Sequence, residues 1–304
     1  MLAFVLYLTY SARKSHSGYN LLIGKMDVFS TIADIRRQRW AEPLVTWGFV
    51  PTMGFLHEGH LSLVRRARQE NDRVGVSIFV NPTQFNDPND LAIYPRDMDR
   101  DLSLLKEEGV DLVWTPRQDI VYPSDYETFI EVEKVTQRLE GAARPGFFRG
   151  VTTVVAKLFN VFQPQRTYFG QKDAQQAIVI KRMVQDLNFD IEVIVCPTVR
   201  EPDGLAMSSR NANLVPAARQ QATCLYRALL AAKNLFEQDE RDAEKLRAKM
   251  VAVIESTDMA HLDYVSVAHP DTLEELTVIE DRALLSLAVF FDTVRLIDNM
   301  ILEK

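Results

Sequence analysis

The stretch Val50-Pro51-Thr52-Met53-Gly54-Phe55-Leu56-His57-Glu58-Gly59-His60 decides the fold, because an apolar strand runs into a glycine-bearing loop with two histidines three positions apart. A helix that begins near Gly59 would place both imidazoles on one face, since residues three apart are neighbours on a helix. The free N–H groups and the positive dipole end of that helix would point into the loop. The pattern predicts a nucleotide-binding turn in which phosphates lie at the start of the helix.

Length and composition are those of an ordinary globular protein. The chain has 304 residues, of which 47% are apolar and 25% charged, enough for one large or two moderate domains with a real core. Its net charge of -7 disfavours a protein that relies on attraction to a phosphate backbone, so we expect no nucleic-acid partner. Cys196 and Cys224 have no CxxC or ligand-like spacing, which predicts neither a disulfide framework nor a zinc site. A reducing cytoplasm is therefore expected.

The first 25 residues need a separate interpretation. Residues 1–10 are almost wholly apolar and are followed by Arg13 and Lys14. Such a run is too short to span a bilayer as a helix, and a secretory signal would carry its positive charge before the apolar run. A targeting segment remains one alternative. We expect instead a poorly ordered extension over 1–25, no membrane association, and a domain that begins near Met26, where regular patterning resumes.

Between 45 and 195, short β-rich runs alternate with helical patterns, which predicts an α/β domain with a parallel sheet and crossover helices. The predicted strands cover 45–50, 74–80, 111–114, 128–132, 167–169 and 191–195. The predicted helices cover 59–71, 96–108, 151–162 and 174–187.

The character of the chain changes after Val199. A loop at 200–204 is followed by two charged amphipathic helices, and then by strand-like runs. This order predicts a smaller α+β domain with an antiparallel sheet, so the expected division is 26–199 and 200–304. The helices are expected at 216–238 and 242–256, and the strands at 262–267, 285–291 and 294–301.

Polar clusters follow the predicted strands where the strands end. His57 and His60 follow the first strand, and Asn81 and Gln84 follow the second. Ligands of open parallel sheets bind beyond the carboxyl ends of the strands, so these loops should converge on one rim. The histidines are suited to donate to triphosphate oxygens, although they could be solvent-facing loop residues. The amides indicate recognition of a polar substrate, unless Asn81 only holds an Asn-Pro-Thr turn.

Two later loops add charge to the same rim. Lys172 offers a point charge to phosphate, while Asp173 could orient a ribose hydroxyl or merely cap a helix, and Gln176 could face the site. The run Met207-Ser208-Ser209-Arg210 offers two hydroxyls and a guanidinium that can surround a pyrophosphate. Its alternative is an N-cap serine beside a surface arginine. The preceding Asp203-Gly204 turn is typical of a flexible entry, so this segment is expected to close over nucleotide.

The loop Arg144-Pro145-Gly146-Phe147-Phe148-Arg149-Gly150 is open to two interpretations, a cover for an anionic substrate or a solvated loop. The sequence has no nucleophile elbow, HExxH, Walker loop or GxGxxG after the first strand. It therefore predicts neither covalent nor metal-centred catalysis, although Mg²⁺ can arrive with a nucleotide.

As a set, these motifs resemble the bacterial pantothenate synthetase family, also called pantoate-beta-alanine ligase. The resemblance covers about 26–304 and rests on PTMGFLHEGH at 51–60, VSIFVNPTQF at 76–85, Tyr94-Pro95-Arg96, the run 144–151, FGQKDAQQ at 169–176 and DGLAMSSRN at 203–211. It implies a reaction in which ATP and pantoate give pantoyl adenylate and pyrophosphate, after which beta-alanine displaces AMP to form pantothenate. It also implies a Rossmann-like doubly wound sheet, a C-terminal lid domain and a homodimer.

The resemblance also implies roles for individual positions. His60 would have the proton-donor role, with His57 its phosphate-binding companion. Gln84 and Gln176 would hold pantoate, with Gln84 also near beta-alanine, and Asn81 and Arg144 are further candidates for substrate binding. The expected ATP site comprises Pro51, Thr52, Met53, Gly54, Phe55, Leu56, His57, Glu58, Gly59, His60, Gly170, Gln171, Lys172, Asp173, Val199, Met207, Ser208, Ser209 and Arg210. Of these, His57, His60, Lys172, Ser208, Ser209 and Arg210 are expected to be catalytic.

The chain departs from the family pattern at Phe147, where the loop commonly reads RPGHFRGV, and the first 25 residues have no counterpart in it. Two other functions compete with the ligase interpretation. A nucleotidylyltransferase that leaves the nucleotide on its product would use the same histidine pair and sheet. A non-catalytic nucleotide sensor, or a relic of a tRNA-charging enzyme, would not need the complete set of Lys172 and Ser208 to Arg210.

Overall fold

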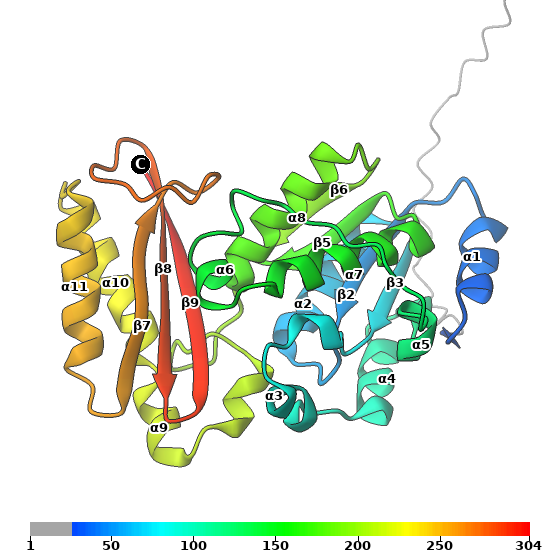
Figure 1. Cartoon of the computed structure of the whole chain (residues 1–304), viewed down its shortest axis with the longest axis horizontal. Helices are drawn as coiled ribbons and strands as arrows, with labels where there is room; N and C mark the ends of the chain where they lie inside the picture. The colour runs from blue at the N-terminus through cyan, green and yellow to red at the C-terminus, as the bar shows by residue number, and fades with distance from the viewer. Residues whose placement is uncertain (1–25) are drawn as a thin grey trace, which may run out of the picture.

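The computed structural model describes residues 26–304, so the extension expected at 1–25 lies outside the described residues. Two units follow one another along the chain (Figure 1). The first is built on a six-stranded sheet and the second on a three-stranded sheet. This arrangement confirms the expected α/β fold with a smaller α+β part.

The larger sheet is parallel throughout, with strand order β1-β4-β3-β2-β5-β6. Its strands are β1 (Asp27–Phe29), β2 (Trp47–Thr52), β3 (Arg73–Ile78), β4 (Leu112–Trp114), β5 (Arg166–Gly170) and β6 (Glu192–Cys196). The chain leaves β2 toward β3 on one side, while β5 pairs with β2 on the other. A binding crevice is expected at such a switch point, between the loops that follow β2 and β5.

Helices cover both faces of this sheet, and each face has its own core. Phe49 and Val50 are neighbours on β2 and point to opposite faces, so Phe49 packs into one core and Val50 into the other. The longer helices of this unit are α1 (Ile32–Ala41), α2 (Glu58–Glu70), α4 (Met98–Glu107), α7 (Phe147–Phe162) and α8 (Ala174–Asp186). Short ones are α3 (Pro88–Ile93), α5 (Gln118–Val121) and α6 (Glu140–Ala143), with 3₁₀ turns η1 (Pro82–Gln84) and η2 (Gln171–Asp173).

The strand predicted at 128–132 is wrong, since this segment is an extended loop that pairs with no strand. Threonine side chains of α7 bind its backbone instead: Ile130 N donates to Thr153 Oγ1 at 3.0 Å, and Thr152 Oγ1 donates to Ile130 O at 2.6 Å. The alternation of apolar and polar residues is real, but it packs the partly buried Ile130 and Val132 against the core rather than placing the segment in a sheet. The strand β1 and the helix α1 were not predicted.

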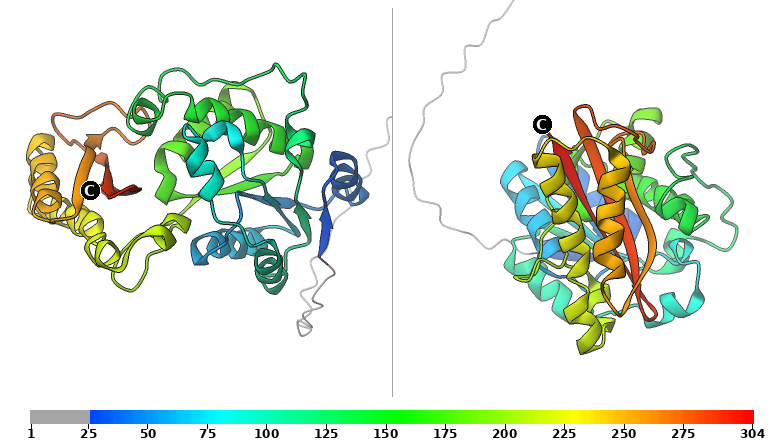
Figure 2. Two further views of the ribbon diagram at one scale, coloured as in Figure 1. Left: turned by 60° about the horizontal axis from the view of Figure 1, so that its bottom comes forward. Right: turned by 90° about the vertical axis from the view of Figure 1, so that its left-hand side faces the viewer.

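The C-terminal unit packs two helices on one face of an antiparallel sheet. The sheet has the order β7-β8-β9, with β7 (Ala260–Ala268), β8 (Arg282–Phe291) and β9 (Val294–Glu303). The helices are α10 (Cys224–Glu237) and α11 (Ala243–Glu255), which lie on the face directed away from the larger unit (Figure 2). The single helix predicted at 216–238 is interrupted, because α9 (Pro216–Gln221) ends before α10 begins.

Between the two units runs the connection that carries the 3₁₀ turn η3 (Ser209–Asn213). Arg200 joins this connection to β9 through a bidentate ion pair with Asp298, with N–O distances of 2.6 and 3.0 Å. Among residues 26–304, no helix is long and apolar enough to cross a membrane.

Candidate active site

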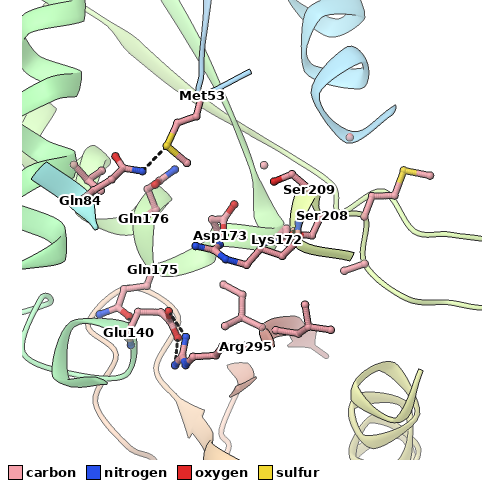
Figure 3. Close-up of a pocket in the computed structure, with 18 of the residues that line it drawn as sticks. Met53, Gln84, Glu140, Lys172, Asp173, Gln175, Gln176, Ser208, Ser209 and Arg295 are labelled. Carbon is pink, nitrogen blue, oxygen red and sulfur yellow. Dashed lines mark hydrogen bonds and ion pairs between the residues drawn. The ribbon is translucent and has the colours of Figure 1, made fainter. Parts of the chain in front are cut away.

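The strand ends of the larger sheet and strand β9 enclose one cavity of about 860 Å³. It receives the loops after β2, β3, β5 and β6, as the sheet topology predicts. Figure 3 shows Gln84, Gln176 and Met53 gathered on one side of this cavity and Ser208 and Ser209 on the other. The predicted residues that line it are Pro51, Thr52, Met53, His57, Gly59, His60, Asn81, Gln84, Arg144, Gly170, Lys172, Asp173, Gln176, Val199, Met207, Ser208, Ser209 and Arg210.

Five positions of the expected ATP site do not line the cavity: Gly54, Phe55, Leu56, Glu58 and Gln171. They shape the surrounding backbone instead. Gly54 and Phe55 form a turn with positive φ angles of 82° and 51°, respectively. The carboxylate of Glu58 points away from the ligand space and forms an ion pair with Arg65.

The histidine pair closes the start of α2 in an unusual capping arrangement. His57 is the N-cap residue, and its Nδ1 accepts from Gly59 N at 3.1 Å. His60 Nδ1 in turn accepts from His57 N at 3.3 Å. A neutral imidazole that accepts through Nδ1 carries its proton on Nε2. Each ring therefore has one donor left, Nε2–H, for a ligand.

Both histidines are neutral at physiological pH. Burial lowers the pKa of His57 from 6.5 to about 4, and the nearby Lys172 ammonium lowers it further. Burial and the neighbouring His57 lower the pKa of His60 from 6.5 to about 3. The ring centroids are 4.1 Å apart, so two imidazolium rings would repel each other strongly. The proton-donor role implied for His60 stays a prediction. The neutral ring can donate a hydrogen bond from Nε2, but it carries no additional proton to transfer.

Asn81 and Gln84 belong to one hydrogen-bonded turn after β3. Asn81 is buried, and its Oδ1 accepts from Thr83 Oγ1 and from Tyr122 OH, each at 2.9 Å. Its Nδ2 donates to Gln84 Oε1 at 3.0 Å. Both ends of the Asn81 amide are thus occupied, which favours the alternative that Asn81 holds the turn. Gln84 Nε2 donates to Met53 Sδ at 2.9 Å, a weak partner that a ligand can replace.

Consecutive glutamines on α8 face different ways. Gln175 is buried and binds the segment before α6, accepting from Glu140 N at 2.9 Å and donating to Val135 O at 2.7 Å. Gln176 lines the cavity, and its side chain forms no hydrogen bond with another described residue. Its free amide is therefore available to a ligand on the same side as Gln84 (Figure 3).

The turn η2 presents a charged pair. Lys172 Nζ lies 3.2 Å from Asp173 Oδ1. Burial alone would raise the pKa of Asp173, but Lys172 lowers it below its usual range, so the group is a carboxylate at neutral pH. Asn299 of β9 fixes this turn, since its Nδ2 donates to Gln171 O at 2.9 Å and to Lys172 O at 2.8 Å. The sequence offered no reason to single out Asn299.

On the opposite side, η3 carries the serines and the arginine. Ser208 is its N-cap, with Oγ accepting from Arg210 N at 3.3 Å, so the capping alternative describes Ser208 correctly. Ser209 Oγ lies 3.4 Å from the hydroxyl of Tyr94. Arg210 forms an ion pair with Asp90 of α3 at 3.4 Å, and both residues line the cavity.

Arg144 is not a solvated loop residue. Its Nη2 donates to Gln84 O at 3.1 Å, and its Cζ lies 3.8 Å from the centroid of the Phe147 ring. Burial lowers the pKa of Arg144 to about 10, which still leaves it charged at neutral pH. At the position where the family commonly has histidine, Phe147 therefore supplies a stacking surface for this arginine.

Sequence reasoning missed two buried carboxylates near the site. Asp101 of α4 accepts backbone N–H groups of the loop after β2, and Glu140 of α6 pairs with Arg295 of β9 at 2.7 Å. A signal for Asp101 was present, because it shares a helix face with the apolar Leu105 four residues later. Glu140 carried no comparable signal, since its partner is 155 positions away.

Within the described part of the chain, no group of three or more His, Cys, Asp or Glu side chains could hold a metal ion. A magnesium ion that arrives on nucleotide phosphates requires few protein ligands, so the donor set fits a phosphate-borne ion rather than an all-protein site.

Comparisons with known proteins agree with this geometry. The family model described as Pantoate-beta-alanine ligase matches residues 27–301. A pantothenate synthetase from Roseiflexus sp. (strain RS-1) is 58% identical over 278 residues, covering 91% of this chain and 100% of that protein. A crystal structure of pantothenate synthetase from Thermus thermophilus superposes with a TM-score of 0.87 at 46% identity, covering 90% of this chain and 99% of that one.

A second similar structure was solved with ligands bound. It is pantoate-beta-alanine ligase from Francisella tularensis, complexed with beta-gamma ATP and beta-alanine, with a TM-score of 0.75 at 37% identity and coverage of 91% of this chain and 97% of that one. The family match extends over nearly the whole described chain. The chain belongs to the pantoate-beta-alanine ligase family.

Proposed function

We propose that the chain catalyses the ATP-dependent condensation of pantoate with beta-alanine, through a pantoyl adenylate, to give pantothenate, AMP and pyrophosphate. The observation that carries this proposal is that one cavity is lined by two sets of polar groups. The first set is the neutral amides of Gln84 and Gln176, and the second is the cations and hydroxyls of Lys172, Ser208, Ser209 and Arg210. The first is suited to an acid that must itself attack, and the second to the charge on a triphosphate. Family membership supports the same reaction.

ATP binds with its phosphates between α2 and η3. The neutral Nε2–H groups of His57 and His60 donate to phosphate oxygens without requiring a proton from solvent. Lys172 supplies a positive charge nearby, and the proximity of phosphate raises the pKa of both imidazoles toward the range in which His60 can act as a proton donor. Val199, Met207 and the other predicted ATP-site residues that line the cavity complete the nucleotide site.

Pantoate lies on the amide side of the cavity, against Gln84 and Gln176. Its carboxylate oxygen attacks the α-phosphorus, the bond from that phosphorus to the bridging oxygen breaks, and pyrophosphate leaves. The carboxylate is already a nucleophile and pyrophosphate a good leaving group, so positioning and charge stabilisation are the main contributions of the protein. Ser208, Ser209 and Arg210 stabilise the departing pyrophosphate once Arg210 exchanges Asp90 for phosphate.

In the second step the neutral amine of beta-alanine attacks the acyl carbon, the bond from that carbon to the AMP oxygen breaks, and the nitrogen releases one proton as the amide forms. The guanidinium of Arg144, held beside Gln84, is suited to receive the carboxylate of beta-alanine. Mg²⁺ bound to the phosphates would neutralise part of their charge. The mixed anhydride is prone to hydrolysis, which makes exclusion of water part of the task of the site.

The C-terminal unit, 200–304 in the predicted division, is proposed to act as the lid. Residues of β9 line the cavity, and Asn299 contacts the turn that carries Lys172. Lid opening would have to break those contacts. The homodimer and the cytoplasmic location stay predictions. Analytical ultracentrifugation tests the first, and fractionation of cells that express the full chain tests the second.

One experiment tests the reaction. The full chain is incubated with ATP, Mg²⁺, pantoate and beta-alanine, and the products are separated by liquid chromatography with mass detection. AMP and pantothenate in equal amounts, both dependent on pantoate and beta-alanine, are the expected result. A nucleotidyl adduct of the acid as the final product would instead establish the nucleotidylyltransferase alternative. Binding of ATP without turnover would point to a nucleotide sensor.

A further inference from the structure

The loop between β2 and α2 has a backbone conformation that its own residues do not favour. Gly54 and Phe55 have positive φ angles of 82° and 51°. Glycine adopts such angles freely, but a side chain such as that of Phe55 disfavours them, so the surroundings must impose the turn. A Cβ on Gly54 would also lie 3.0 Å from Asp101 Oδ2, a tight contact that adds to the strain of the positive φ.

The surroundings that impose the turn are two adjacent residues of α4. Asp101 is 1% exposed, and its two carboxylate oxygens accept from successive backbone amides, Phe55 N on Oδ2 and Leu56 N on Oδ1, each at 2.7 Å. Arg100 Nη1 donates to Leu56 O at 2.9 Å, and its Cζ lies 5.6 Å from the centroid of the Phe55 ring. Both sides of the Leu56 backbone are therefore held by α4. Bonds to a charged acceptor are the stronger kind, and burial of Asp101 makes them hard to exchange for water.

This arrangement continues directly into the histidine pair. Leu56 precedes His57, whose backbone N–H donates to His60 Nδ1 and whose ring caps α2. The orientation of the Leu56–His57 peptide thus decides whether His60 Nδ1 has its donor. That donor in turn fixes the Nε2–H tautomer of His60. Neither Arg100 nor Asp101 lines the cavity, so any effect they have on a ligand passes through the loop.

We propose that Asp101, with Arg100 beside it, is a positioning residue for the nucleotide site. It fixes the Gly54–Leu56 turn and thereby orients the Nε2–H donors of His57 and His60 toward the phosphates. The effect on the KM for ATP rests on the proposed function. The effect on the loop conformation and on the tautomers of the two imidazoles does not depend on it.

The test compares Asp101→Asn with the matched variant Asp99→Asn. Both lose one carboxylate on the same helix, but Asp99 is exposed and forms no hydrogen bond with the loop. In Asp101→Asn one oxygen is replaced by an NH₂ donor, which faces a backbone N–H it cannot bind. We expect the ¹⁵N spectrum of the imidazoles to show that His57 and His60 lose their single tautomer. We expect the KM for ATP to rise roughly tenfold or more, with the KM for beta-alanine unchanged. Asp99→Asn should stay within about twofold of wild type.

A second variant keeps the proposal testable if Asp101→Asn does not fold. The side chain of Arg100 is 46% exposed, so Arg100→Met removes the bond to Leu56 O with little risk to folding. We expect a smaller change of the same kind in ring tautomers and in the KM for ATP. If Asp101→Asn folds and changes neither the tautomers nor the KM for ATP, the positioning role is overturned. If Asp101→Asn does not fold, the same result in Arg100→Met overturns it. If the wild type makes no pantothenate but the tautomers still change, the positioning role stands and the proposed function fails.

Discussion

At the residue scale, the most consequential property of the site is the neutrality of its two histidines. The sequence predicted that His57 and His60 face phosphates, and their spacing was sufficient to place them together. It could not predict that each would cap the helix through Nδ1, because that depends on the path of the loop. The result is a pair of neutral imidazoles, each with one Nε2–H donor left for a ligand.

The neutrality of the pair predicts a specific dependence of stability on pH. Both folded-state pKa values, about 4 and about 3, lie below the unfolded value of 6.5. As the pH falls below 6.5 the unfolded chain takes up protons before the folded one, so stability is complete above that pH and declines toward pH 3. We expect the stability advantage of wild type over the double variant His57→Asn, His60→Asn to shrink over this window in urea unfolding. The exposed His261→Asn serves as control. A constant difference from about pH 7.5 to about pH 4.5 would refute the assignment.

Lys172 is the charge whose removal should affect chemistry most and folding least. Its only ion pair with another described residue is with Asp173, and a pair of this kind at a partly exposed site contributes little to stability. We expect Lys172→Ala to lower pantoate-dependent exchange between pyrophosphate and ATP by at least about a hundredfold. Its unfolding free energy should stay within about 1 kcal/mol of wild type. Lys181→Ala on the exposed face of α8 is the control. Wild-type exchange rates in Lys172→Ala would remove Lys172 from the mechanism.

At the scale of elements, the site depends on how closely α7 approaches the turn η1. Gly150 makes this possible, since a Cβ there would lie 2.3 Å from Thr83 O and 2.9 Å from Gln84 N. Asn81 Nδ2 also donates to Gly150 O at 3.1 Å, so the helix and the turn hold one another. The position of Gln84 is therefore set by a glycine on another element.

Gly150→Ala should consequently displace the turn and impair pantoate binding. We expect a loss of about 1–3 kcal/mol in unfolding free energy and a rise in the KM for pantoate with ATP binding retained. Gly170→Ala, where the nearest atom to an added Cβ is 4.0 Å away, should change the unfolding free energy by less than about 0.5 kcal/mol. Equal stability of the two variants in urea unfolding would show that the approach of α7 is not constrained.

The sequence pattern predicted helices and strands well where buried residues recur with the period of a helix or a strand. The apolar runs of β2, β3 and β5 and the helices α2, α4, α7 and α8 lie within a few residues of their predicted bounds. The strand prediction for 128–132 failed because alternating apolar and polar residues indicate a half-buried extended segment, whether a sheet or a helix covers it. Residues such as Asp101 and Asn299 were missed because their partners are backbone groups far along the chain, which carry no side-chain pattern.

At the scale of the whole molecule, a buried ion pair links the two units. Each unit has its own apolar core, although Leu273 and Leu284 of the C-terminal unit pack against the core of the larger one. Arg295 of β9 forms a bidentate pair with Glu140, at 2.7 and 2.8 Å (Figure 3). Tyr264 OH donates to the same carboxylate at 2.9 Å. Because α6 leads into the loop of Arg144, this contact relates the position of the C-terminal unit to the substrate side of the cavity.

Glu140→Gln should loosen the junction between the units. Removal of one partner of a buried pair leaves Arg295 with Asp263 alone, and we expect a loss of about 2–4 kcal/mol in unfolding free energy. Hydrogen exchange should accelerate in β9 and around Arg144 while the six-stranded sheet stays protected. Glu237→Gln, on the exposed surface of α10, is the matched control. Uniform acceleration over the whole chain would mean that Glu140 supports overall stability rather than the junction.

In the lining of the cavity, the carboxylate of Asp90 already occupies the guanidinium of Arg210. Any anion that recruits Arg210 must first displace a carboxylate that belongs to the protein. A small anion such as sulfate or free phosphate replaces one contact by another and gains little. In the ATP site proposed above, a triphosphate would reach Lys172 and the imidazoles at the same time, so its gain would exceed the loss of the pair. In the proposed ATP site the pair would thus favour a triphosphate over a smaller anion, independent of any contact with adenine.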